Sequence, residues 1–140
     1  MNFRPILYIN GLFLSILSLS MVLPMLADFY FGYDDWKVFF VCIIITAFFG
    51  GALILSTMGD EFKFTTKQAF MLTNLTWLIL PAFAALPFWF SSLGMSFTDS
   101  YFESMSAITT TGSTVITGLD YAPAGILLWR AILQWLGGIG

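Results

Sequence analysis

The stretch of sequence that decides the fold is SFTDSYFESMSAITTTGSTVITG, residues 96–118. Its first half predicts a short helix, because Ser96 or Thr98 can accept the N-capping hydrogen bond and acidic residues follow in the early turns. The eleven residues from Thr98 to Ile108 would rise about 16 Å, roughly half of a hydrocarbon core. A helix of this length suits a segment that enters a membrane from outside and ends near the midplane.

The second half of the stretch is rich in hydroxyl groups. Six of the nine residues from 109 to 117 are Thr or Ser, and Gly112 permits a backbone conformation that β-branched neighbours resist. This composition favours extended chain over helix, and such chain is tolerated at membrane depth only where protein buries it or water lines it. Residues 119–123 are then predicted to return to the outer surface, and residues 124–140 to begin a helix that runs inward.

The rest of the chain is dominated by long uncharged runs. Residues 5–27, 38–58 and 68–98 carry no charged side chain, and each run exceeds the roughly 20 residues that a spanning helix needs. Apolar residues make up 59% of the 140 and charged residues only 9%, whereas a soluble domain carries about 25% charged residues. The sequence therefore predicts three membrane spans before the short helix.

Several chemistries are excluded by composition. The chain has no His and a single Cys, Cys42, so His-ligated metals, thiolate zinc clusters and an internal disulfide are ruled out. A net charge of −3 without a basic patch does not suit a nucleic-acid partner. A soluble enzyme is likewise excluded, and a membrane enzyme would need clustered ionisable residues within its spans.

Basic residues set the orientation. Arg4 precedes the first span, and Lys63 and Lys67 lie between the second and third spans. Because basic loops are retained in the cytoplasm, the N-terminus is predicted inside. The loop over residues 28–37, which carries three Asp and one Lys, is predicted outside.

Small residues and prolines predict details of the spans. Gly11, Ser15 and Ser18 share one face of the first span, and the pair at 47 and 51 (Ala, Gly) is spaced for close helix packing on the second. The prolines at 81 and 87 are predicted to bend the third span, because each removes a backbone donor.

The helix–loop–helix arrangement favours a cation site. The short helix would direct the negative end of its dipole toward the membrane centre, and the following strand would present carbonyl oxygens that replace an ion's hydration shell. Asp99, Glu103 and Asp120 are predicted to lie outside and to raise the local cation concentration. The plainer interpretation is a Thr-rich outer loop with a short interfacial helix.

Arg130 is a charge placed within a predicted membrane helix. It is expected to pair with Glu103 or Asp120, to bind pore-loop carbonyls, or to snorkel to the outer interface. The glycine-rich end of the same helix (residues 137–140) is expected to serve either as a hinge or as a close-packing site.

Two motifs carry a resemblance to a known family. YFESMSA at 101–107, followed by TTTGST at 109–114, resembles the first pore loop of the TrkH/TrkG potassium-uptake proteins of the Trk/Ktr/HKT superfamily. The residues WR at 129–130 and QWLGGIG at 134–140 resemble the start of the helix that follows that loop. The first two spans match the extra N-terminal helix pair of the family, so the resemblance covers the whole chain.

The resemblance implies a fold and a domain organisation. It implies an all-α integral membrane protein with transmembrane helices, a re-entrant pore helix and an extended filter loop. Residues 1–67 would form an N-terminal two-helix transmembrane hairpin. Residues 68–140 would form the first span–pore loop–span repeat, truncated in its last helix. Members of the family carry four such repeats, so the chain looks like an N-terminal portion.

The resemblance also implies a function. The chain would belong to the pore-forming subunit of a potassium uptake system of the bacterial inner membrane, with K⁺ as the transported ion, no covalent cofactor and no enzymatic activity. Carbonyls of Thr109, Thr110, Thr111 and Gly112 would form one quarter of the selectivity filter. The implied partners are membrane lipid, a cytoplasmic nucleotide-binding (TrkA-like) gating subunit and a second copy in a homodimer. The alternative is a non-conducting integral-membrane assembly subunit.

Overall fold

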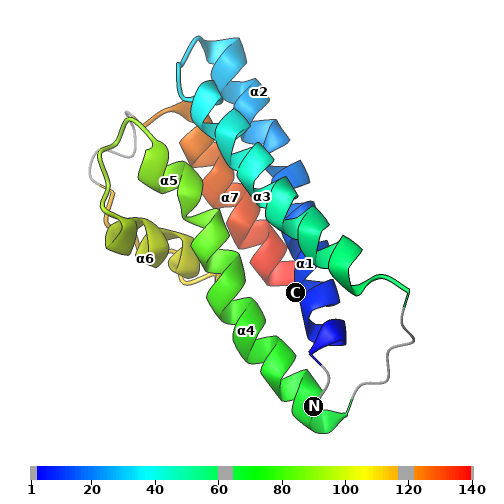
Figure 1. The fold of residues 1–140 in the computed structure, drawn as a ribbon. Helices are drawn as coiled ribbons and strands as arrows, with labels where there is room; N and C mark the ends of the chain where they lie inside the picture. Colours follow the sequence, from blue (N-terminus) through cyan, green and yellow to red (C-terminus); the bar gives the residue numbers. More distant parts are fainter. Residues whose placement is uncertain (1–2, 60–64, 117–121, 140) are drawn as a thin grey trace.

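The protein is described here by a computed structural model over residues 3–59, 65–116 and 122–139, and the regular structure of these residues is helical throughout. The helices, in chain order, are α1 (Arg4–Ser20), α2 (Val22–Phe31), α3 (Trp36–Thr57), α4 (Thr66–Ala84), α5 (Leu86–Phe90), α6 (Phe97–Ile108) and α7 (Ala124–Ile139) (Figure 1).

Three of the helical stretches have the length and apolar composition to cross a membrane. They are Arg4–Phe31, Trp36–Thr57 and Thr66–Phe90, with 28, 22 and 25 residues. At 1.5 Å per residue, even the shortest spans about 33 Å, slightly more than a hydrocarbon core. The three spans predicted from the uncharged runs are therefore confirmed, and the protein is a multi-pass membrane protein.

The first span is interrupted at Met21, where α1 ends and α2 begins. Pro24 lies three residues further on and has no N–H to donate to the carbonyl one turn earlier. The interruption therefore has a local cause in the sequence. The helix nevertheless continues past the predicted end of the span, because α2 extends to Phe31.

The position of Asp28 corrects a prediction. Asp28 was assigned to the acidic outer loop, but it lies inside α2 and is fully buried. Gly32, in the left-handed conformation with φ of 80°, ends the helix one turn later. The assignment from sequence was wrong because it followed the charge of Asp28, whereas one oxygen of this carboxylate accepts a hydrogen bond from the backbone N–H of Gly125 on another helix.

The third span is broken at Ala85, between α4 and α5. Pro81 lies inside α4, and Pro87 lies in the first turn of α5, where a proline is tolerated. The bend predicted from the two prolines is thus confirmed as a break between them. At the other end of the span, Thr65 and Gln68 form a capping box that starts α4.

Helices α1 and α3 pack closely through glycine. A Cβ on Gly11 would lie 2.9 Å from the carbonyl oxygen of Gly50, and a Cβ on Gly50 would lie 2.9 Å from Ser15 Oγ. The packing face predicted on α1 is therefore confirmed at Gly11 and Ser15. The face predicted on α3 was wrong by one position: Gly51 has open space around it, and Ala47 is exposed.

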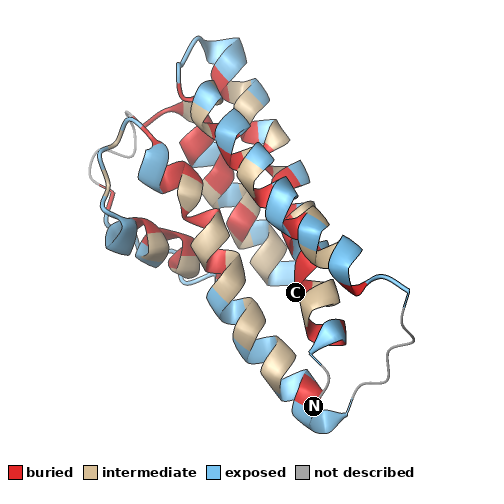
Figure 2. Ribbon diagram, in the orientation of Figure 1, coloured by how far each residue is buried: buried red, intermediate tan, exposed pale blue. Residues whose placement is uncertain are grey.

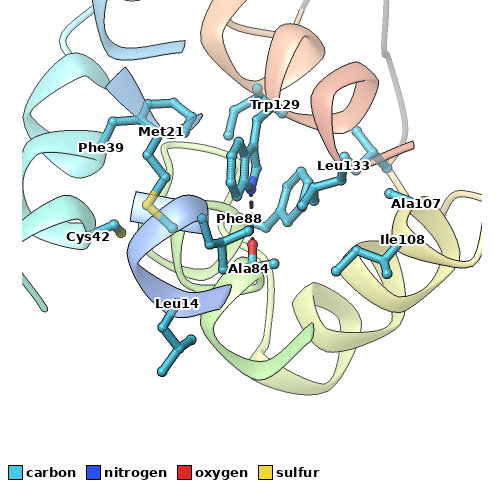
Figure 3. Packing of buried hydrophobic residues seen from close by; sticks show 13 residues of the cluster. Leu14, Met21, Phe39, Cys42, Ala84, Phe88, Ala107, Ile108, Trp129 and Leu133 are labelled. Atoms are coloured by element: carbon cyan, nitrogen blue, oxygen red, sulfur yellow. Dashed lines mark hydrogen bonds between the residues drawn. The ribbon is translucent and has the colours of Figure 1, made fainter. Parts of the chain in front are cut away.

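Helix α7 contacts α2 on one side and α6 on the other (Figure 1). Its buried side chains Ile126, Trp129 and Leu133 belong to the main apolar cluster, and Figure 2 shows buried positions concentrated on α7 and the helices around it. Trp129 is fully buried, and its Nε1 donates to the carbonyl oxygen of Ala84 at 3.0 Å (Figure 3). Its ring also meets Phe39 of α3 edge to face. Trp129 therefore ties α7 to the break in the third span.

Candidate functional site

Helix α6 begins with the cap that its sequence predicts. Ser96 Oγ accepts a hydrogen bond from the backbone N–H of Asp99 at 3.1 Å, so Ser96 rather than Thr98 is the N-cap. Asp99 adds a negative charge in the first turn, where the helix dipole favours it. The helix has 12 residues and rises about 18 Å, well short of a full span.

A buried serine and a tyrosine attach α6 to α4. Ser104 Oγ donates to the carbonyl oxygen of Pro81 at 2.6 Å, and Tyr101 Oη donates to the carbonyl oxygen of Leu78 at 3.3 Å. Both acceptors lie near the break in the third span. Ser104 was not among the residues predicted to matter. Its signal was weak, since serines on a short helix also suit an exposed face.

The chain turns back sharply after α6. The backbone N–H of Thr110 donates to the carbonyl oxygen of Ala107 at 3.0 Å. The N–H groups of Thr111 and Gly112 both donate to the carbonyl oxygen of Ser106, at 2.9 and 3.3 Å. Ser106 Oγ in turn donates to the carbonyl oxygen of residue 113 at 2.6 Å. The last turn of α6 thereby holds the beginning of the loop by its N–H groups.

Two residues of this turn adopt positive φ. Gly112 has φ of 81° and Thr110 has φ of 60°. A Cβ on Gly112 would have nothing within 4 Å, so the dihedral and not the available space requires glycine there. β-branched residues such as Thr110 rarely adopt this region, so the backbone at Thr110 is strained. This strain was not predicted from the sequence.

The turn leaves a row of backbone acceptors free. Residues 109–112 are exposed, and their carbonyl oxygens accept no hydrogen bond from the part of the chain that is described. The Thr109 hydroxyl donates to the carbonyl oxygen of Met105 at 2.8 Å and lies 2.9 Å from the Thr111 hydroxyl. The loop continues without regular secondary structure through Ile116, while residues 117–121, which include Asp120, lie outside the described residues.

Glu103 corrects another prediction. It was expected outside, among acidic groups that attract cations, but it is fully buried. Its Oε1 accepts from Thr114 Oγ1 at 2.7 Å, and its Oε2 accepts from the backbone N–H of Val115 at 3.0 Å. A carboxylate that is satisfied in this way holds the returning part of the loop against α6.

Arg130 supplies the counter-charge for this carboxylate. Its Nε donates to Glu103 Oε1 at 2.5 Å, and the Arg130 side chain is only 14% exposed. Pairing with Glu103 was one of the predicted alternatives and is confirmed. Because both charges are largely removed from solvent, each makes the burial of the other tolerable.

The end of α7 packs on the end of α6. A Cβ on Gly137 would overlap the carbonyl oxygen of Ile108, so only glycine allows this approach. Gly138 is looser, with Thr110 Cγ2 as the nearest atom at 4.0 Å. Close packing, one of the two roles considered for the glycine-rich end, is thus confirmed for Gly137. Gly140 lies outside the described residues.

These features define a class of protein. This multi-pass helical membrane protein carries a short helix and an irregular loop between a kinked span and a further apolar helix, which is the arrangement of a re-entrant loop. The family model TrkH, described as "Cation transport protein", matches residues 35–140. The chain belongs to the TrkH family.

Curated relatives and a solved structure agree with this membership. The chain is 41% identical over its whole length to "Trk system potassium uptake protein TrkH" of Halomonas elongata, covering 29% of that protein. It is 35% identical to the TrkH protein of Escherichia coli K12, again over 29% of its length. The crystal structure of the potassium transporter TrkH from Vibrio parahaemolyticus matches all of the chain with a TM-score of 0.94 at 35% identity, and 30% of that chain is covered. The chain thus spans under a third of these relatives.

Proposed function

We propose that this chain forms the first of four walls of the ion pathway in a potassium uptake protein of the bacterial inner membrane, as part of its pore-forming subunit. The observation that carries the proposal is the loop after α6. The carbonyl oxygens of residues 109–112 are exposed and free of hydrogen bonds from the described chain, while the N–H groups of the same turn are bound to α6.

The chemistry of the loop suits an alkali cation. Carbonyl oxygens replace the hydration shell of K⁺ in selectivity filters, and Thr hydroxyls are hard oxygen donors of the same kind. The C-terminal end of α6 adds the negative end of its dipole. The positive charge of Arg130, on α7, is neutralised by Glu103 and does not oppose ion binding.

One loop supplies one wall, because carbonyl coordination needs a ring of ligands. Residues 1–67 are proposed as a hairpin that precedes the first repeat, residues 68–140. The proposed orientation places Arg4 and Lys67 on the cytoplasmic side. A homodimer and a cytoplasmic nucleotide-binding (TrkA-like) subunit are the proposed partners, supported by membership of the family and the names of the relatives. Those relatives are named as uptake proteins and not as enzymes, in agreement with a non-enzymatic role.

A non-conducting assembly subunit remains the alternative function. It would account for the close approach of Gly11 and Gly50, which any bundle of membrane helices uses. It would not account for a loop in which Thr110 and Gly112 both adopt positive φ and the carbonyls between them accept no hydrogen bond from the described residues.

The test uses the full-length gene product in cells that lack potassium transport. The wild type is expected to restore potassium uptake. Gly112→Ser is expected to lower the affinity for potassium and let sodium compete better, because a side chain opposes the positive φ of this residue.

Thr114→Ser is the control for this variant, since serine keeps the hydroxyl that donates to Glu103. Uptake is measured at several sodium concentrations and at matched membrane expression. If the potassium affinity and the sodium competition of Gly112→Ser equal those of the wild type, the loop is not part of the filter.

A further inference from the structure

Two buried carboxylates in the N-terminal part of the chain accept hydrogen bonds from the segments that flank the pore loop. Asp28 Oδ1, on α2, accepts from the backbone N–H of Gly125 at 2.5 Å. Asp35 Oδ2, just before α3, accepts from Ser92 Oγ at 3.0 Å and from the Ser92 N–H at 3.4 Å. Asp28 is fully buried and Asp35 is 7% exposed. These bonds join residues that are 97 and 57 positions apart in the sequence.

Asp28 serves as an N-cap for a helix to which it does not belong. Gly125 is the second residue of α7, and Pro123, which precedes the helix, has no side-chain acceptor of its own. A carboxylate here satisfies a backbone donor and lies at the positive end of the α7 dipole. A Cβ on Gly125 would lie 2.5 Å from Asp28 Cγ, so glycine is needed for the carboxylate to approach.

Asp35 is used in a comparable way. It occupies the N-cap position of α3, yet its side chain makes no capping hydrogen bond to that helix. The carboxylate binds Ser92 instead, in the segment between α5 and α6. Four residues later, Ser96 caps α6. Asp35 therefore does not cap its own helix, and its carboxylate instead holds the segment that leads into α6.

The two contacts lie on either side of the pore loop in the sequence. The loop follows α6, and α7 carries both Arg130, which pairs with Glu103, and Gly137, which packs on Ile108. The contacts that hold the loop and the end of α6 therefore depend on the position of α7. Ser92 precedes α6, whose last turn binds the start of the loop.

We propose that Asp28 and Asp35 are positioning residues that make the N-terminal hairpin an outer clamp on the pore loop, holding the chain before α6 and the start of α7. This inference rests on the proposed function for its effect on ions. The effect of the two carboxylates on the structure of the loop is measured separately from ion transport.

The experiment compares variants of the full-length protein in two measurements. Asp28→Leu removes the acceptor at similar volume, whereas Asp28→Asn keeps Oδ1. Asp35→Leu and Ser92→Ala remove the second contact from its two sides. Asp34→Asn is the matched control, because Asp34 lies between α2 and α3, next to Asp35, and is exposed.

The first measurement is potassium uptake into proteoliposomes, with and without sodium, at equal amounts of folded protein. Asp28→Leu and Asp35→Leu are expected to raise the potassium concentration for half-maximal uptake, and the competition by sodium, by about two- to thirtyfold. Asp28→Asn and Asp34→Asn are expected to behave as the wild type. The double variant Asp35→Leu/Ser92→Ala should be no worse than Asp35→Leu alone, because both changes break one contact.

The second measurement is hydrogen exchange of the backbone amides in residues 106–116, which does not depend on transport. Asp28→Leu and Asp35→Leu are expected to speed exchange in this segment, and Asp34→Asn is not. Unchanged exchange overturns the clamp, as does a loss of protein yield with unchanged potassium half-saturation. Faster exchange in a protein whose wild type takes up no potassium would support the clamp and refute the proposed function.

Discussion

Arg130 Nε and Glu103 Oε1 are 2.5 Å apart, and they join α7 to α6 across 27 positions of sequence. The same Glu103 oxygen accepts from Thr114, and its other oxygen accepts from the Val115 N–H. The ion pair is thus the link through which α7 holds the loop. The main energetic effect of the pair is the loss of stability that follows when one of the two buried charges is left without its partner.

Removing one charge of this pair should therefore be worse than removing both. Arg130→Gln leaves a buried carboxylate without its counter-charge, for which we expect a loss of about 3–5 kcal/mol in the free energy of unfolding. The double variant Glu103→Gln/Arg130→Gln has no unpaired charge and should be more stable than Arg130→Gln. Thermal unfolding of the full-length protein in detergent measures both. A double variant that loses the sum of the two single losses would contradict the pairing.

Gly137 and its neighbour Gly138 provide a matched pair. Gly137→Ala places a methyl group on the carbonyl of Ile108, so α7 must move away from α6, at a cost of about 1–3 kcal/mol. Gly138→Ala meets only Thr110 Cγ2 at 4.0 Å, and it should gain up to about 1 kcal/mol from helix propensity. The melting temperatures of the two variants should therefore shift in opposite directions. Equal shifts would show that the end of α7 does not pack on α6.

Gly50 and Gly51 test the packing of α1 on α3 in the same manner. Gly50→Ala crowds Ser15 Oγ and the Gly11 carbonyl, within 3.1 Å, and is expected to destabilise the pair of helices by about 1–3 kcal/mol. Gly51→Ala meets open space and should be neutral or slightly stabilising. Thermal stability of each variant in lipid nanodiscs is the measurement. A larger loss of stability from Gly51→Ala than from Gly50→Ala would show that Gly51 lies on the packing face, as predicted from the sequence.

Thiol labelling tests the orientation of the spans. Cys42 is fully buried in α3 and should resist aqueous reagents, so it provides a silent background once that is verified. Tyr33 lies just before α3 and Thr66 is the first residue of α4, and both are exposed. In intact cells, Tyr33→Cys should react with a reagent that cannot cross the membrane, and Thr66→Cys should react only with one that can. Labelling of both from one side would refute the orientation argued from Arg4 and the lysines near α4.

Several features follow from the sequence because their causes are local. An uncharged run of twenty or more apolar residues needs no partner to be recognised as a span, since the bilayer is its solvent. Ser96 caps α6 through a residue three positions away. The two prolines bend the third span through donors that they lack themselves. Gly112 was singled out for its conformational freedom, and its φ of 81° uses that freedom.

Only the tertiary structure decided the features whose partners are distant in sequence. Whether Glu103 faced water or protein depended on Arg130, which lies on α7, 27 positions away in the sequence. Asp28 is buried and not exposed because Gly125, 97 residues away, offers its N–H to the carboxylate. The choice between Gly50 and Gly51 depended on the rotation of α3 against α1. A charge or a small residue in an apolar helix predicts that some other part of the protein contacts it. Which part does so depends on burial and on helix rotation, and these are properties of the packed bundle.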